Sequence, residues 1–282
     1  MKTRSARNEP AADTGVLVDA DWLDAHLQNP AVRVVEVDVS RRAHDEWHIE
    51  GAVLWDVYRD LKDADYRLIG TEATMRLLAR SGIGPHSIVV FHGYAPALGF
   101  WLMKLYGHDD ARILDCSRDA WRDEGHPVSR QPSEPTAAGY VLPGPDLRLR
   151  AGHATVRDAI GRPGRTLLDV RSRDEYRGER FWPSGGPEPG GRAGHVPSAV
   201  HQPIDGLYDE RGAFRDAAAL RSVFCATDLD GEDELITYCT IGGRACTAWF
   251  VLTYLLGRDR VQVYDGSWAE WGRMPEAPVE QA

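Results

Sequence analysis

The sequence predicts an α/β protein built from two similar domains, each a parallel sheet with helices on both faces. Short apolar runs of strand length alternate along the chain with stretches of helix length, as expected for parallel strands joined by crossover helices. Three sequence segments recur in the same order in the two halves. The chain has 282 residues, more than a single core usually holds, so two domains are expected.

The three recurring segments define the repeat. Each pair shares its apolar and polar pattern, and the third pair matches its Asp, Ser and Trp at identical spacing. Residues 34–38 (VVEVD) resemble 167–171 (LLDVR), 47–53 (WHIEGAV) resemble 194–200 (GHVPSAV), and 114–121 (LDCSRDAW) resemble 264–271 (YDGSWAEW). Three matches in one order indicate two copies of one structural unit.

The individual elements follow from the apolar runs and the residues that end them. The predicted strands of the first copy are 32–37, 88–91 and 111–114, and those of the second are 166–170, 235–238 and 260–264. The predicted helices are 21–27, 72–81, 97–106, 217–225 and 245–256. Three of these helices end at a glycine that suits a left-handed cap, namely Gly82, Gly107 and Gly257.

The domain bounds follow from the repeat and from composition. The segment 125–145 is rich in Pro, Gly, Ser and Thr, as linkers are. We therefore expect a flexible N-terminus (1–13), a non-catalytic domain (14–126), a linker (127–146) and a catalytic domain (147–282).

Composition excludes several classes of function. Lys plus Arg number 33 against 43 Asp plus Glu, and a net charge of −10 argues against nucleic acid as the main partner. No apolar stretch reaches the roughly 18 residues of a membrane span, and the N-terminus lacks a secretory signal, so we expect a cytoplasmic protein without a membrane partner. The cysteines show no zinc-ligand spacing and are expected as free thiols without a metal or cofactor: Cys116, Cys225, Cys239 and Cys246.

The hexapeptide CTIGGR at 239–244 is the strongest chemical signal. Cys239 follows a predicted strand, and a long apolar helix begins just after Arg244. Two glycines let the intervening backbone turn its N–H groups inward, and the helix adds its positive end, so the loop forms an anion site around the sulfur. Such an environment favours the nucleophilic thiolate.

Only the second copy carries this loop. Aligning the copies on the preceding strand places His92 opposite Cys239, and the distance to the closing glycine is 15 residues in the first copy against 18 in the second. We therefore expect the first copy to lack both the nucleophile and three residues of the loop. Its sheet edge is expected to wall the active-site cleft, because ligand sites favour domain interfaces and the carboxyl ends of parallel strands.

Taken together, these segments resemble the tandem-domain sulfurtransferases of the rhodanese family. The runs 169–179 (DVRSRDEYRGE), 192–200 (RAGHVPSAV), the Cys239 loop and 264–272 (YDGSWAEWG) come in the family's order, and 244–257 and 264–280 are similar to thiosulfate sulfurtransferases of actinobacteria. The resemblance implies a persulfide on Cys239 and two rhodanese-like domains. It also implies donor binding by the loop residues Thr240, Ile241, Gly242, Gly243 and Arg244.

Loop length bears on the main competing function. Phosphatases of the same superfold have a longer loop between Cys and Arg, with room for a phosphate, whereas four residues separate Cys239 from Arg244. The loop also lacks an acidic or histidine general acid, which sulfur transfer does not need. Both features favour sulfur transfer.

The identity of the sulfur donor stays open. Many thiosulfate enzymes of the family carry a cation where this chain has Thr240, and many mercaptopyruvate enzymes have a different loop end from Gly243-Arg244. In many family members a substrate-binding arginine directly precedes an aromatic residue at the position of Tyr176, and this chain has Glu175 in place of that arginine. We expect a thiosulfate sulfurtransferase that passes a sulfane sulfur to cyanide or a thiol. The alternatives are a 3-mercaptopyruvate sulfurtransferase, a dedicated donor to a biosynthetic protein, and a persulfide-carrying binding module.

Four further residues carry expectations. Arg192 lies in the Pro- and Gly-rich run 183–194 and is a second candidate anion ligand, with a solvated loop arginine as the alternative. The resemblance implies a structural salt bridge between Arg171 and an acidic neighbour. Trp249 and Phe250 are expected in the core, as residues of a helix that is apolar all round. The partners expected are a small-molecule donor and acceptor, or a sulfur-carrier protein as acceptor. A monomer is favoured because the repeat already forms a pseudo-dimer.

Overall fold

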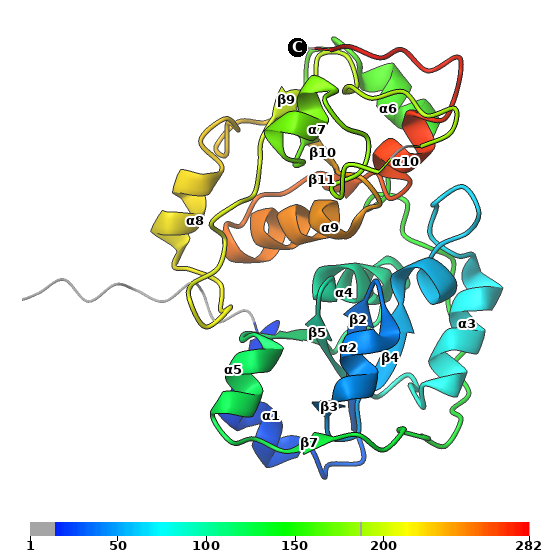
Figure 1. The fold of residues 1–282 in the computed structure, drawn as a ribbon, viewed down its shortest axis with the longest axis vertical. Helices are drawn as coiled ribbons and strands as arrows, with labels where there is room; N and C mark the ends of the chain where they lie inside the picture. Colours follow the sequence, from blue (N-terminus) through cyan, green and yellow to red (C-terminus); the bar gives the residue numbers. More distant parts are fainter. Residues whose placement is uncertain (1–14, 187, 282) are drawn as a thin grey trace, which may run out of the picture.

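The computed structural model describes residues 15–186 and 188–281, so the predicted flexible N-terminus (1–13) lies outside the described residues. The described chain forms two halves that stack on one another, with helix α4 (Pro96–Leu105) of the first facing helix α9 (Gly243–Phe250) of the second (Figure 1). Each half holds one parallel sheet flanked by helices, which confirms the predicted fold class. None of the helices in the described part of the chain is long and apolar enough to cross a bilayer.

The first sheet runs in the order β1-β6-β5-β2-β4, with every neighbouring pair parallel. Its strands are β1 (Leu17–Val18), β2 (Val32–Asp38), β4 (Val53–Asp56), β5 (Ile88–Gly93) and β6 (Ala111–Leu114). The remaining elements of this half are α1 (Ala20–His26), α2 (Arg41–Glu46), the π-helical turn η1 (Val57–Leu61), α3 (Thr71–Arg80) and α5 (Arg118–Asp123), with a short antiparallel pair β3 (His48–Ile49) and β7 (Val128–Ser129).

The second sheet runs in the order β11-β10-β8-β9, again entirely parallel. Its strands are β8 (Arg165–Asp169), β9 (Val200–His201), β10 (Glu234–Tyr238) and β11 (Val261–Val263). The helices are α6 (His153–Ala159), α7 (Arg173–Arg177), α8 (Ala217–Val223), α9, the π-helical turn η2 (Val251–Leu255) and α10 (Ser267–Trp271).

The long elements lie where the sequence predicts them, and the short ones were missed. All six predicted strands are present, and Gly82, Gly107 and Gly257 have the left-handed backbone expected after α3, α4 and η2. Strands β1, β4 and β9 have only two to four residues, too few for a periodic signal. The predicted domain bounds stay predictions. Residues 128–129, at the start of the expected linker, pair with β3 of the first half.

The strand registers confirm the internal repeat and correct one detail of its alignment. Val35 pairs with Val53 in the first sheet as Leu168 pairs with Val200 in the second. On the other side of the same strands, Glu36 pairs with His92, whereas Asp169 pairs with Tyr238. His92 is therefore equivalent to Tyr238, and Gly93, not His92, stands opposite Cys239.

The corrected alignment also relocates the missing residues of the first copy. Helix α4 has 10 residues, whereas α9 and η2 continue as one helix of 8 and 5 residues. The connection from Gly93 to α4 is shorter than that from Cys239 to α9 by a single residue. Most of the difference that we assigned to the loop therefore lies in the helix.

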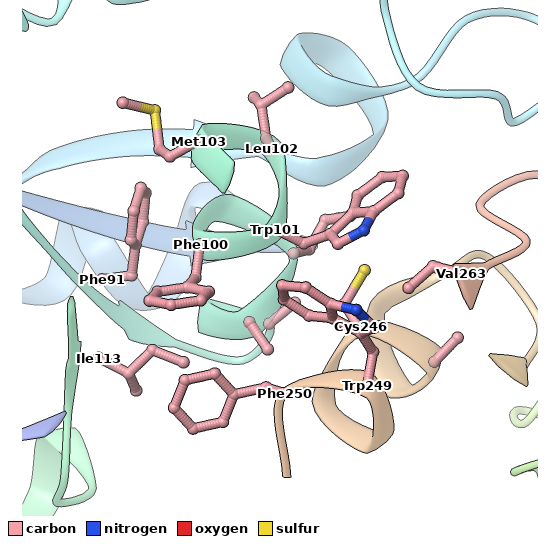
Figure 2. Packing of buried hydrophobic residues seen from close by; sticks show 14 of the residues in the cluster. Phe91, Phe100, Trp101, Leu102, Met103, Ile113, Cys246, Trp249, Phe250 and Val263 are labelled. Atoms are coloured by element: carbon pink, nitrogen blue, oxygen red, sulfur yellow. The ribbon is translucent and has the colours of Figure 1, made fainter. Parts of the chain in front are cut away.

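The main core joins the two halves. Phe100 on α4 meets Phe250 on α9 edge to face, with ring centroids 5.0 Å apart, and Trp249 packs on the same ring (Figure 2). Trp249 and Phe250 are fully buried, which confirms them as core residues. The largest hydrophobic cluster thus contains side chains of both sheets, and separating the halves would expose it.

Two short arms also connect the halves in a pseudo-twofold arrangement. Arm 62–68, closed by a bridge between Lys62 and Leu68, reaches the second half, where the Leu68 N–H donates to Asp265. Arm 208–214 has the same bridge at its ends and reaches the first half, where the Phe214 N–H donates to Asp115. Each arm therefore lies at the carboxyl edge of the opposite sheet.

Candidate active site

Cys239 directly follows strand β10, four residues before helix α9 begins, and it is 1% exposed. Its Sγ accepts a hydrogen bond of 3.1 Å from the Gly242 N–H. Gly242 has φ +94°, a backbone conformation that favours glycine, and this turn directs its N–H at the sulfur. The first N–H groups of α9 and its positive end lie just beyond.

The segment around Ser267 binds the backbone of Cys239. The Ser267 hydroxyl accepts a bond of 3.1 Å from the Cys239 N–H and donates one of 2.8 Å to the Tyr264 carbonyl. The backbone N–H of Trp268 donates to the Cys239 carbonyl. Ser267 itself has φ +53°, an uncommon conformation for a residue with a side chain. The start of α10 thus fixes the backbone that carries the sulfur.

A buried carboxylate holds the other side of the loop. Glu175 accepts two hydrogen bonds from Arg244, at 2.9 and 2.7 Å, and one of 2.6 Å from the Thr240 hydroxyl. It also accepts from the Ser172 hydroxyl at 2.8 Å and from the Ser172 backbone N–H at 3.1 Å, and the second bond belongs to the capping box of α7. Glu175 therefore ties the ends of the loop to helix α7.

The charges of this pair reinforce each other. Burial by itself would raise the pKa of Glu175, but the hydrogen bonds and charge of Arg244 outweigh it and hold that pKa at about 2. Burial would likewise lower the pKa of Arg244, but its bonds to Glu175 and the nearby sulfur of Cys239 raise it. Both groups are charged at neutral pH, so Glu175 balances the charge that Arg244 brings to the loop.

A cavity of about 450 Å³ opens over the loop. Its walls are mainly aromatic, and Arg244 is the only cationic side chain among the described residues that line it. The lining is Val39, Val57, Tyr58, Tyr66, Tyr94, Ala95, Trp182, Pro183, Ser184, Cys239, Thr240, Ile241, Gly243 and Arg244. The ring centroid of Tyr66 lies 5.6 Å from that of Trp182, so side chains of the two halves meet at the rim.

The first half supplies one wall of this cavity, as expected. Val39, Tyr58 and Tyr94 follow strands β2, β4 and β5, at the carboxyl edge of the first sheet. Cys239 lies at the same edge of the second sheet. The carboxyl ends of the two sheets therefore face each other across the cavity, where α/β proteins commonly bind ligands.

The structure brings most predicted site residues together and separates one of them. Cys239, Thr240, Ile241, Gly243 and Arg244 line the cavity, and Gly242 lies behind it with its N–H on the sulfur. Arg192 is not among the lining residues, and its guanidinium donates to the Met274 carbonyl. Arg171 forms the expected structural salt bridge with Asp169, and both side chains are fully buried.

Several residues of the site escaped the sequence analysis. Tyr58, Tyr66, Tyr94 and Trp182 have no local signal, because they reach the cysteine only through contacts between distant segments. Ser267 did carry a signal, since it recurs in both copies of the repeat. In the described part of the chain, no group of three or more His, Cys, Asp or Glu side chains is arranged to hold a metal ion.

Comparisons with known proteins bear on this geometry. The family model of the rhodanese-like domain matches residues 153–274, which include the whole Cys239 loop. A "Putative thiosulfate sulfurtransferase" of Mycolicibacterium smegmatis is 38% identical over 275 residues, covering 95% of this chain and 99% of that protein. A protein of the same name from Haloferax volcanii is also 38% identical, over 94% of this chain and 96% of the relative.

Solved structures show the same fold. The anaerobic ergothioneine biosynthesis enzyme of Chlorobium limicola, solved with trimethyl histidine, superposes with a TM-score of 0.83 at 22% sequence identity. The match covers 96% of this chain and 71% of that one. At this identity the likeness concerns the architecture of the two halves.

Proposed function

Because this chain belongs to the rhodanese family, we propose that it transfers a sulfane sulfur from thiosulfate to cyanide or a thiol through a persulfide on Cys239. The observation that carries the proposal is the hydrogen bond from the Gly242 N–H to the Cys239 sulfur at the base of an open cavity. A sulfur at the start of a helix, with a backbone donor on it, is arranged to carry negative charge. Relatives of matching length carry the name "Putative thiosulfate sulfurtransferase".

The reaction proceeds in two steps. The Cys239 thiolate attacks the outer sulfur of thiosulfate; a new S–S bond forms, and the S–S bond of the donor breaks. Sulfite leaves with the electron pair, and a cysteine persulfide anion remains. Cyanide or a thiolate then attacks the outer sulfur, which departs as thiocyanate or a new persulfide and regenerates the Cys239 thiolate. Such covalent catalysis gives ping-pong kinetics.

The residues of the loop stabilise the anions of both steps. The Gly242 N–H donates a hydrogen bond to the sulfur, and the positive N-terminus of α9 lies next to it. Arg244 faces the cavity where the donor's oxygens would lie. The aromatic side chains at the rim exclude water from the persulfide. Sulfite, which leaves in the first step, and the Cys239 thiolate, which leaves in the second, are both stable anions, so no protonated general acid is required.

A second donor deserves a parallel test because of the charge balance in the loop. Arg244 donates to both carboxylate oxygens of Glu175, through Nη1 and Nη2, and Thr240 is neutral. One balanced cation suits a monoanionic donor such as 3-mercaptopyruvate at least as well as the thiosulfate dianion. The same persulfide would then form with pyruvate as the product.

The test is thiocyanate formation from cyanide, with thiosulfate and with 3-mercaptopyruvate in parallel. Wild type is compared with Cys239→Ser, and with Cys225→Ser as a control because Cys225 is exposed and lies elsewhere. We expect turnover with thiosulfate that only Cys239→Ser abolishes. A strong preference for 3-mercaptopyruvate would reassign the donor. Absence of Cys239-dependent turnover with either donor would overturn the proposal for small acceptors.

A further inference from the structure

Lys62 is a buried lysine at the interface between the two halves. It is one of three lysines in a chain with thirty arginines, and it is 6% exposed at the base of arm 62–68. Its Nζ donates a hydrogen bond of 2.7 Å to the backbone carbonyl of Asp265, across the interface between the halves. A flexible, strongly hydrated ammonium is rarely buried without a specific reason.

The negative charge of Asp265 acts on Lys62, but its carboxylate is bound to other groups. The Asp265 carboxylate is taken by a two-bond pair with Arg150, at 2.7 and 3.0 Å, and by the Leu68 N–H. Within residues 15–186 and 188–281, Lys62 takes part in no ion pair with an acidic side chain. Burial lowers the pKa of Lys62, as expected for an ammonium whose only hydrogen-bond partner is a carbonyl.

The ammonium lies against the loop that carries the nucleophile. Lys62 Nζ is 3.1 Å from the position that a Cβ on Gly242 would occupy, and the N–H of the same glycine donates to Cys239 Sγ. The negative charge of Asp265 is the largest effect that opposes burial and raises the pKa of Lys62, and the nearby sulfurs of Cys246 and Cys239 act in the same direction. The titratable and charged groups around Lys62 are thus Asp265, Arg150, Cys246 and Cys239.

The other arm provides an internal comparison. Arm 208–214 begins with Tyr208 at the position equivalent to Lys62, and it lies at the sheet edge that lacks a nucleophile. The ammonium is therefore present only at the edge with the reactive cysteine. Of the two nearby thiols, burial raises the pKa of Cys246 well above its usual range and keeps it neutral, which leaves Cys239, the nucleophile of the proposed function, as the thiol that Lys62 can serve.

We propose that Lys62, supplied by the non-catalytic half, is the counter-charge for the sulfur anion on Cys239. This rests on the proposed function only in that Cys239 carries the anion. Lys62 does not touch the sulfur; it is a positioning residue whose charge acts across Gly242 on the thiolate and the persulfide. It contributes the positive charge that Arg244, balanced by Glu175, does not provide.

The first test measures the electrostatic potential at Cys239 and does not depend on catalytic turnover. Alkylation of the Cys239 peptide by anionic iodoacetate and by neutral iodoacetamide is followed by mass spectrometry between pH 5 and pH 10. We expect Lys62→Met and Lys62→Gln to lower the iodoacetate-to-iodoacetamide rate ratio at least about threefold. The midpoint of the pH profile is expected to move upward by about 1 pH unit.

Matched variants separate charge from packing. Lys62→Gln keeps a donor for the Asp265 carbonyl, so an effect shared with Lys62→Met reports the charge. Lys104→Met is the control, because Lys104 also donates to backbone carbonyls but lies on α4, over the ring of Phe100. An unchanged ratio in both Lys62 variants, or an equal change in Lys104→Met, would overturn the proposal. Alkylation needs no sulfur donor, so failure of the proposed function shows separately, in the thiocyanate assay.

The second test observes the lysine. With three lysines in the chain, 13C-labelled lysine gives three Cε signals, and Lys62→Met assigns the one of interest. We expect the titration of Lys62 to move to lower pH in Cys239→Ser, because the partner anion is lost, and to stay in place in Cys246→Ser. The opposite pattern would make Cys246 the partner and refute the assignment.

Discussion

At the scale of single residues, Gly242 has more constraints than any other position of the loop. It is left-handed, its N–H donates to the nucleophilic sulfur, and its Cα faces Lys62 and the Asp265 carbonyl. A Cβ there would come within 2.8 Å of that carbonyl oxygen. The backbone conformation and the close packing both require glycine.

We predict that Gly242→Ala lowers the rate of Cys239 alkylation at least about tenfold and destabilises the protein by about 1–3 kcal/mol. Gly257→Ala is the matched control, because Gly257 is also left-handed, at φ +70°, but has open space around its Cα. It should lose about 1 kcal/mol in urea unfolding and keep the wild-type alkylation rate. Equal alkylation rates in the two variants would contradict the role of Gly242.

Arg244 and Glu175 act on the sulfur with opposite signs. Removing Arg244 leaves the Glu175 carboxylate, with its negative charge, bound only to Thr240 and Ser172. We predict that Arg244→Ala moves the midpoint of the Cys239 alkylation profile to higher pH by about 1 unit, and that Glu175→Gln moves it to lower pH. Arg192→Ala, whose guanidinium binds the Met274 carbonyl, should leave the profile in place. A shift in Arg192→Ala as large as that in Arg244→Ala would return Arg192 to the anion site.

At the scale of elements, the two equivalent strand ends have diverged chemically. Strand β10 ends at Tyr238 and is followed by Cys239, whereas the equivalent residues of β5 are His92 and Gly93. His92 is buried, and neither ring nitrogen has a hydrogen-bond partner in the described chain. Burial lowers the pKa of His92 to about 4, so the folded protein holds it neutral.

We predict that buried His92 makes the folded protein lose stability in mild acid. The unfolded chain binds a proton at His92 near pH 6.5 and the folded one only near pH 4, so stability falls as the pH drops through this window. The loss amounts to about 3 kcal/mol. Glu175, with its pKa lowered to about 2, adds a further loss between about pH 4.5 and pH 2.

Urea unfolding at pH 7, 5 and 4 tests the first window. His92→Gln should lose less stability than wild type over this range, by up to about 3 kcal/mol, because the group that must take up the proton is gone. His86→Gln, at an exposed position, is the control and should follow wild type. If His92→Gln follows wild type as well, the acid sensitivity resides elsewhere.

At the scale of the whole molecule, the pseudo-twofold arms make the two halves dependent on each other. Asp265 receives arm 62–68 and pairs with Arg150, whereas Asp115 receives arm 208–214 through the Phe214 N–H. The first arm also carries Tyr66 into the rim of the cavity. Of the two arms, only arm 62–68 therefore contributes to the cavity over Cys239.

We predict unequal costs for removing the two carboxylates. Asp265→Ala leaves the guanidinium of Arg150 without its partner and should cost about 3–5 kcal/mol. Asp115→Ala leaves the single Phe214 N–H and should cost about 1–3 kcal/mol. Only Asp265→Ala should change the alkylation of Cys239. Equal costs in urea unfolding, or an equal change in alkylation, would show that the arms are equivalent.

The sequence by itself determined the α/β class, the internal repeat, the long helices and the Cys239 loop, because each depends on neighbouring residues or on a pattern with a fixed period. Tertiary structure alone decided what surrounds the sulfur. Tyr58, Tyr94 and Lys62 approach the Cys239 loop from the other half, and Glu175 binds the loop from α7. The pairing of strands also decided that Gly93 stands opposite Cys239. These features arise from contacts between segments far apart in the chain, and no local pattern encodes such a distance.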